Sequence, residues 1–113
     1  MKRAITIYNP EFADIAISRG IARDEITHMV QPTIDDVKQY IVENPHVKTI
    51  IAPSIPSLSG KYKVMERFVD YCFANRVNII IPSENMALFT DDGDIGIKFK
   101  MELLLQTDFE RFN

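Results

Sequence analysis

Residues 54–63, S-I-P-S-L-S-G-K-Y-K, are the stretch of this sequence whose composition best suits a ligand-binding loop. They follow an apolar run, V-K-T-I-I-A-P, that is typical of a buried parallel strand. A P-loop has the form G-x-x-x-x-G-K-[ST], where the first glycine lets the backbone surround the phosphates and the hydroxyl binds Mg²⁺. Here Gly60 and Lys61 are present, but Ile55 replaces the first glycine and Tyr62 replaces the hydroxyl residue. The loop therefore does not predict a nucleoside-triphosphate site.

The same loop offers a weaker site for an anion. Ser57 and Ser59, with backbone N–H groups at the start of the helix that follows, have the chemistry to hold a phosphate or sulfate. Lys61 and Lys63 are close by in the sequence. The alternative interpretation, which we favour, is that Ser59 caps this helix and that both lysines are solvated.

Two other groups of charged residues are candidates for binding a ligand or a metal ion. Arg19 and Arg23 flank a turn and could approach the carboxyl edge of the sheet, where ligands of open α/β sheets bind. The alternative, which we favour, is that they interact with a helix end or with solvent. An acidic turn at 90–96 lacks the ligand spacing of a calcium-binding EF-hand loop. We therefore interpret its three aspartates as helix capping residues, Asp91, Asp92 and Asp94.

Length and composition indicate one globular domain spanning residues 1–113. Apolar residues make up 46% and charged residues 26%, which is enough apolar material for a core. The 13 lysines and arginines against 16 aspartates and glutamates give a net charge of −3. Because nucleic-acid binding depends on neutralising phosphates with cations, this balance disfavours direct DNA binding.

The sequence has few residues that bind metals or form disulfides. His28 and His46 lie in different segments, and the single cysteine, Cys72, completes no metal-ligand spacing, so we expect neither a metal nor a cofactor. One cysteine forms no internal disulfide, which fits a reducing compartment. No apolar run approaches the roughly 20 residues that span a bilayer, and residues 4–8 are too short for a signal-peptide core. We therefore expect a cytoplasmic protein without a membrane segment.

Apolar runs and turn residues divide the chain into alternating strands and helices. Strands are predicted at residues 4–8, 47–52, 77–81 and 86–89. Helices are predicted at residues 10–20, 33–44, 61–75 and 95–112. Residues 25–31, E-I-T-H-M-V-Q, suit either a second strand or an extension of helical structure. The alternation predicts a three-layer α/β fold with a mostly parallel, four- to five-stranded sheet flanked by helices and followed by a long C-terminal helix.

From Val47 onward the chain resembles the catalytic domain of the serine recombinases, the resolvase/invertase family. In that family a buried strand leads into a loop of the form L-D-R-L-x-R, followed by a helix, a second strand, a T-D-G-D-M-G-like turn and a long helix. The corresponding segments here are V-K-T-I-I-A-P, I-P-S-L-S-G, residues 61–75, V-N-I-I-I and T-D-D-G-D-I-G. Glu110-Arg111 is similar to an A-E-R segment of the long helix. The resemblance covers residues 34–111 and implies a resolvase-like fold.

The resemblance does not extend to the catalytic residues of that family. The family loop carries an Asp-Arg pair and a further Arg, where this sequence has Pro56, Ser57 and Gly60. The family pattern at the first strand is Tyr-x-Arg-x-Ser, in which the serine attacks the DNA phosphodiester. The stretch T-I-Y-N-P puts other residues in those places, namely Thr6, Tyr8 and Pro10. Because phosphoryl transfer of this kind needs the hydroxyl nucleophile and the guanidinium groups, we expect no recombinase chemistry.

The final helix, I-G-I-K-F-K-M-E-L-L-L-Q-T-D-F-E-R-F, has more apolar residues than one packed face needs. One stripe consists of Ile97, Met101, Leu104, Leu105 and Phe112, and it is widened by Phe99, Leu103 and Phe109. In the resembled family this helix contributes to the dimer interface. We therefore expect a homo-oligomer, a dimer, that forms through the stripe, with Ile97, Met101, Leu104 and Leu105 as interface residues. The alternative is a helix buried in a wide groove of its own domain.

Two functional hypotheses remain open at this point. The first is a non-catalytic, resolvase-like domain that acts through self-association or through association with a related recombinase. The second is a small binding protein that holds a phosphate-bearing or nucleotide ligand at the loop after the central strand, through Ser57, Ser59, Lys61 and Lys63.

Overall fold

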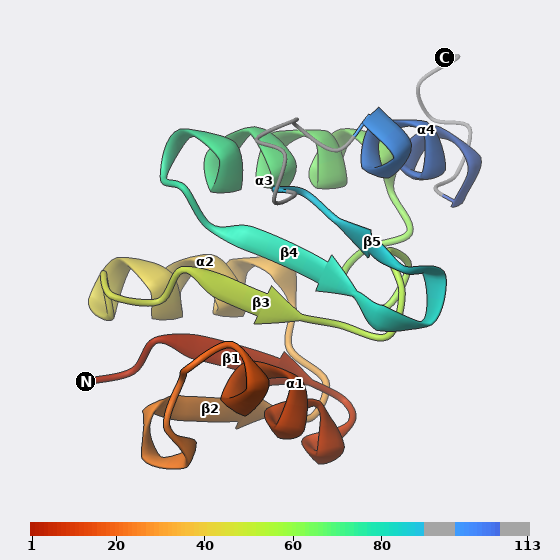
Figure 1. Cartoon of the computed structure of the whole chain (residues 1–113). Helices are drawn as coiled ribbons and strands as arrows, with labels where there is room; N and C mark the ends of the chain where they lie inside the picture. The colour runs from red at the N-terminus through yellow and green to blue at the C-terminus, as the bar shows by residue number, and fades with distance from the viewer. Residues whose placement is uncertain (90–96, 107–113) are drawn as a thin grey trace.

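The computed structural model describes residues 1–89 and 97–106, except for the side chains of residues 97, 98 and 100. Five strands form one sheet in the order β2-β1-β3-β4-β5, in which β1 to β4 are parallel and β5 is antiparallel to β4 (Figure 1). The strands are β1 Ala4–Ile7, β2 Ile26–Met29, β3 Thr49–Ile51, β4 Asn78–Ile81 and β5 Met86–Ala87. The helices are α1 Ala13–Ser18, α2 Ile34–Glu43, α3 Tyr62–Ala74 and α4 Ile97–Gln106. The predicted α/β fold with a mostly parallel sheet is confirmed.

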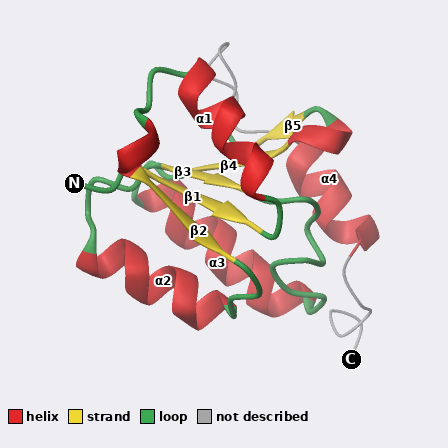
Figure 2. Cartoon of the chain, turned by 90° about the horizontal axis from the view of Figure 1, so that it is seen from below, coloured by secondary structure: helices red, strands yellow, loops and turns green. Residues whose placement is uncertain are grey.

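Helices cover both faces of the sheet. Figure 2 shows α1 on one face and α2 and α3 on the other, with α4 beyond α3 at the β5 side. Because strand side chains alternate between faces, Ile79 and Ile81 belong to the large core under α2 and α3, whereas Ile80 belongs to a smaller core under α1. The smaller core is built around Ala4 and Ala16, which let the short helix α1 approach the sheet closely.

The start and end of α1 follow the sequence signals. The Asn9 side chain accepts a hydrogen bond from the Glu11 N–H at 2.9 Å, and Pro10 opens the 3₁₀ turn that leads into the helix. At the other end Gly20 has a φ of +87°, which is favourable for glycine. The Gly20 N–H bonds to the Ile17 carbonyl and the next N–H bonds to the Ala16 carbonyl, which is a Schellman motif.

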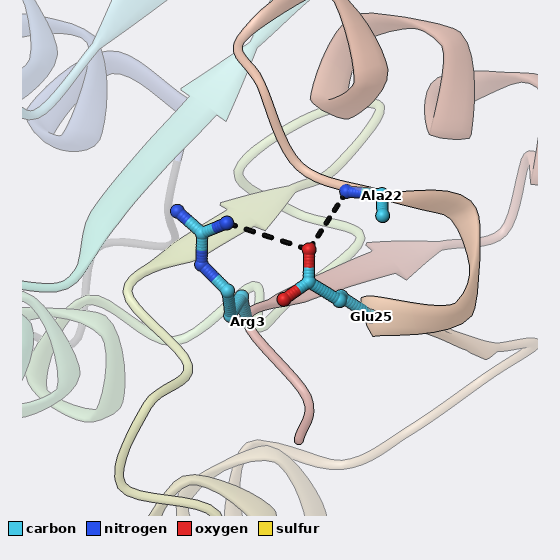
Figure 3. A network of polar contacts seen from close by, with 3 residues as sticks. All are labelled: Arg3, Ala22 and Glu25. Carbon is cyan, nitrogen blue, oxygen red and sulfur yellow. Dashed lines mark hydrogen bonds and ion pairs between the residues drawn. The ribbon is translucent and has the colours of Figure 1, made fainter.

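The ambiguous segment at residues 25–31 contains β2, an edge strand that pairs with β1. A polar network fixes the start of β2 (Figure 3). The Glu25 carboxylate accepts hydrogen bonds from the Ala22 N–H at 2.9 Å and from the Arg3 guanidinium at 3.4 Å. The Ala22 N–H and then Arg3 hold the pKa of Glu25 below its ordinary value. The Arg3 N–H also bonds to the Glu25 carbonyl at 2.8 Å, so β2 is tied to the residue before β1.

Helix α4 spans ten residues in the described part of the chain. The predicted extension to residue 112 lies outside the described residues, and so do the turn at 90–96 with its three aspartates, Phe109, Glu110-Arg111 and Phe112. No helix among the described residues is long and apolar enough to cross a membrane.

Candidate functional site

The strand order reverses between β1 and β3, because the chain runs from β1 outward to β2 and then returns to the other side of β1. In open α/β sheets, ligands bind at the carboxyl ends of the strands beside such a switch point. The residues that follow β1 and β3 are Tyr8 and the loop that begins at Ala52. The loop at residues 54–63 therefore lies at the edge where this class of fold binds its ligands.

Tyr8 has an unusual backbone conformation at this edge. Its φ is +69°, and the Asn9 N–H bonds back over it to the Ile7 carbonyl at 2.8 Å, which closes a tight turn. A non-glycine residue in this region costs on the order of 1–3 kcal/mol, and such strain concentrates at functional positions. The side chain is 42% exposed, and its hydroxyl accepts a hydrogen bond from the Gln31 amide at 3.2 Å. The turn therefore holds the Tyr8 ring at the surface beside the ends of β1 and β2.

The serines at the start of the loop bond to one another. The Ser57 N–H donates to the Ser54 Oγ at 3.2 Å, the Ser54 N–H donates to the Ser57 Oγ at 3.3 Å, and the Ser57 hydroxyl donates to the Ser54 carbonyl. Ile55 and Leu58 between and beyond them are buried and belong to the large core. The Ser57 hydroxyl proton is thus used to shape the loop, which is anchored by its apolar neighbours.

Of the other three predicted anion-binding residues, Ser59 lies two residues before the N-cap of α3 and is therefore not its cap. The N-cap is Lys61, which makes no side-chain capping bond, and the Ser59 Oγ accepts the Lys61 N–H at 3.1 Å. Lys61 and Lys63 are exposed. Ser59 lines a cleft of about 440 Å³ between the starts of α2 and α3, which Asp35 also lines. The Asp35 carboxylate disfavours an anion in this cleft.

The positions that correspond to the recombinase catalytic residues carry other interactions. Thr6 is fully buried, and its hydroxyl shares a hydrogen bond of 2.8 Å with the His28 Nδ1. Pro10 begins the 3₁₀ turn after Tyr8. At the loop, Pro56 and Gly60 are exposed residues without a charge. These positions therefore supply neither an aliphatic hydroxyl at the nucleophile place nor a guanidinium group.

The two arginines that were considered for this edge lie in different places. Arg19 borders a cavity of about 220 Å³ together with Pro82 and Asn85, which follow β4, so it reaches the carboxyl end of that strand. Arg23 precedes β2 and forms an exposed ion pair with Asp14 at 3.6 Å. Arg23 therefore agrees with the favoured interpretation of a solvated charge, and it does not approach the carboxyl edge because it lies before its strand and not after it.

The second candidate surface is on α4. Phe99 is fully buried and Leu103 is 4% exposed, so these two residues anchor the helix in the large core. Met101, Leu104 and Leu105 are 59%, 41% and 76% exposed. Their spacing of three and four residues puts them on one face of the helix. We call these three residues the α4 stripe; the side chain of the fourth predicted interface residue, Ile97, lies outside the described part of the chain.

A groove runs beside the α4 stripe. It has a volume of about 300 Å³, and α3 and α4 provide its walls, Tyr62, Glu66, Val69, Asp70, Leu103 and Leu104. The end of α4 is held by Gln106, whose amide donates to the Glu84 carboxylate at 2.8 Å and to the Glu102 carboxylate at 2.8 Å. The stripe and groove thus form one surface, apolar on its α4 side and acidic along α3.

Comparison of the sequence with known proteins gave no match: no protein-family model matches the chain, and no curated protein matches it significantly. Among the described residues, no group of three or more histidine, cysteine, aspartate or glutamate side chains is arranged to hold a metal ion. The fold and the two surfaces define an α/β domain with a doubly wound strand order and an exposed apolar helix face.

Proposed function

We propose that this chain is a non-catalytic, resolvase-like domain that acts by associating with a second copy of itself through α4. The observation that carries the proposal is the α4 stripe. Three large apolar side chains, Met101, Leu104 and Leu105, are exposed next to one another on a helix that is already anchored by Phe99 and Leu103. Monomeric proteins seldom expose a contiguous apolar patch of this kind unless it binds something.

Residues at the end of the first strand and in the loop after β3 support a domain without recombinase chemistry. The place of the attacking serine holds Pro10, which has no hydroxyl, and the hydroxyl of Thr6 is buried against His28. The places of the family's loop charges hold uncharged residues, Pro56, Ser57 and Gly60. A phosphodiester at this edge would meet neither the nucleophile nor the cations that stabilise charge on its oxygens.

The alternative, a phosphate or nucleotide ligand at the loop after β3, has less support. The Ser57 hydroxyl donates within its own loop, and Ser59 shares its cleft with Asp35. Direct DNA binding stays disfavoured by the net charge of −3. A related recombinase is the alternative partner for the α4 stripe; a second copy is proposed first because it needs no further component.

The proposal is tested by comparing the wild type with Leu105→Asp and Val42→Asp in sedimentation velocity. Val42 is a matched control, since it is a 68% exposed apolar residue on α2, away from the stripe. Burying a leucine contributes about 1.5–3 kcal/mol, and about 1.4 kcal/mol corresponds to a tenfold change. We expect Leu105→Asp to weaken the dimer by at least about tenfold, because each dimer contains the change twice. Equal behaviour of the two variants would contradict the proposal.

A further inference from the structure

The outward face of α3 carries four charges in a regular order. Met65, Phe68, Val69 and Cys72 face the core, so the opposite side of the helix is in solvent. On that side lie four exposed residues at a spacing of three, one and three, which we call the α3 charge stripe: Lys63, Glu66, Arg67 and Asp70. Along the helix their signs read plus, minus, plus, minus.

Within a single helix this order contributes little, because pairs of like charge offset pairs of opposite charge. Residues four apart are neighbours on a helix surface, and like charges at that spacing are destabilising. Lys63 and Arg67 are such a pair, and so are Glu66 and Asp70. The pairs at a spacing of three are of opposite sign, but no ion pair involving Lys63, Arg67 or Asp70 forms within the described part of the chain. The Glu66 carboxylate instead accepts the Tyr62 hydroxyl at 3.0 Å.

The same order is favourable between two antiparallel copies. A two-fold axis across α3, midway between Glu66 and Arg67, brings Lys63 of one copy opposite Asp70 of the other. It also brings Glu66 of one copy opposite Arg67 of the other. Every charge then meets its opposite, whereas a parallel pairing would put each residue opposite its own kind. Two-fold interfaces are self-complementary in this sense, because both copies use the same patch.

The charge stripe also continues into the surface that carries the proposed function. Glu66 and Asp70 belong to the α3 wall of the groove whose other wall includes Leu104 of the α4 stripe. An apolar centre with a charged rim is the usual arrangement of a protein interface. In such interfaces complementary rim charges set orientation and exclude wrong arrangements more than they add affinity.

We propose that α3 and α4 together form a two-fold symmetric interface in which the α3 charge stripes of two copies lie antiparallel. This inference rests on the proposed self-association and adds its symmetry and register. It assigns α4 the apolar contacts and α3 the choice of orientation.

The experiment mixes two charge-reversed chains, Lys63→Glu and Asp70→Lys. In either homodimer the two facing pairs between positions 63 and 70 are of like charge, glutamate–aspartate in the first and lysine–lysine in the second, whereas the Glu66–Arg67 pairs are unchanged. In the mixed dimer every facing pair is of opposite charge again. We expect each variant alone to dimerise about tenfold more weakly than the wild type, and an equimolar mixture to recover wild-type affinity as a heterodimer, measured by native mass spectrometry and sedimentation velocity. Raised salt should reduce the differences in dimer affinity between the variants and the wild type, since exposed charges are screened.

A matched pair of variants on the α1 side, Arg19→Glu and Glu11→Lys, makes the same changes of net charge at exposed residues. These chains should dimerise like the wild type, separately and mixed. Circular dichroism checks that all four variants are folded.

A second test is the double variant that carries Glu66→Arg and Arg67→Glu in one chain. It exchanges the two central charges, so position 66 of one copy still faces a residue of opposite charge at position 67 of the other. We expect its dimer affinity to stay within about threefold of the wild type, whereas either single change should weaken the dimer.

The outcomes separate this inference from the proposed function. A wild-type chain that is monomeric throughout overturns both. A wild-type dimer that Leu105→Asp disrupts, but that neither Lys63→Glu nor Asp70→Lys weakens, leaves the proposed function in place and overturns the antiparallel register. Weakened variants whose mixture does not recover overturn the register as well.

Discussion

Replacing Leu103 and Leu105 separately by alanine tests how α4 is docked, because the two residues are two positions apart on one helix. Leu103 is 4% exposed and lies in the large core with Phe99, whereas Leu105 is 76% exposed. Truncating a buried leucine to alanine costs about 2–5 kcal/mol through lost burial and the cavity that remains. Truncating an exposed one changes the free energy of unfolding by at most about 0.5 kcal/mol. We therefore expect Leu103→Ala to be strongly destabilising and Leu105→Ala to be nearly neutral.

The assay is urea unfolding followed by far-ultraviolet circular dichroism, at a protein concentration low enough to keep the chain monomeric. With a urea dependence of about 2 kcal/mol per molar, in the middle of the usual range, the expected loss moves the midpoint of Leu103→Ala down by about 1–2.5 M. The Leu105→Ala midpoint should stay close to that of the wild type. Equal shifts, or a larger shift for Leu105→Ala, would show that α4 presents a different face to the core and would remove the basis for the α4 stripe.

Three further predictions concern other parts of the fold. Glu25→Gln should destabilise the domain most near neutral pH: the Ala22 N–H and Arg3 lower the pKa of Glu25 below 4.5, so its stabilising effect is present above that pH and disappears as the pH falls through the lower value. Urea titrations from about pH 7 to pH 3 would show the difference from wild type shrinking, and a constant difference would contradict the assignment. Burial raises the pKa of the Cys72 thiol to about 12, so a thiol reagent near pH 8 should label Cys72 only as fast as the domain opens; rapid labelling in native buffer would refute this. Thr6→Val should cost about 1 kcal/mol through the lost bond to His28, measured by thermal unfolding, and an unchanged melting temperature would argue against that bond.

Much of the fold is predictable because its signals are local. The isoleucine runs of β3 and β4 are buried on both sides of the sheet, and such continuous runs are typical of central parallel strands. The start of α2 is equally clear, since Thr33 and Asp36 form a capping box. These segments carry their structural information in their own residues.

The segment around β2 could not be assigned from its residues, and the reason is its position at the sheet edge. Its side chains are mostly half-buried or exposed, so the apolar alternation that identifies a strand is weak. What makes it a strand is pairing with β1 and the bonds between Glu25 and Arg3, which join residues far apart in the sequence. A tertiary contact of this kind leaves no pattern in the segment itself.

The candidate surfaces were predictable to different degrees. The surplus of apolar residues in the last helix indicates an exposed stripe, but which residues dock depends on α3 and β5, and the structure selects Phe99 and Leu103 as anchors. The backbone strain at Tyr8 has no sequence signal, because tyrosine rarely adopts a positive φ. The charges of α3 are visible in the sequence, but an exposed helix face of mixed charge is as typical of simple solvation until its neighbours are known.

The measurement that tests the central claim most directly is the mass of the wild-type chain in solution, by sedimentation equilibrium over about a hundredfold range of concentration. Association through α4 predicts a mass that rises with concentration from the 13.0 kDa of the single chain to twice that value and then stays constant. A mass of 13.0 kDa at every concentration would contradict it, and the exposed α4 stripe would then need a different partner.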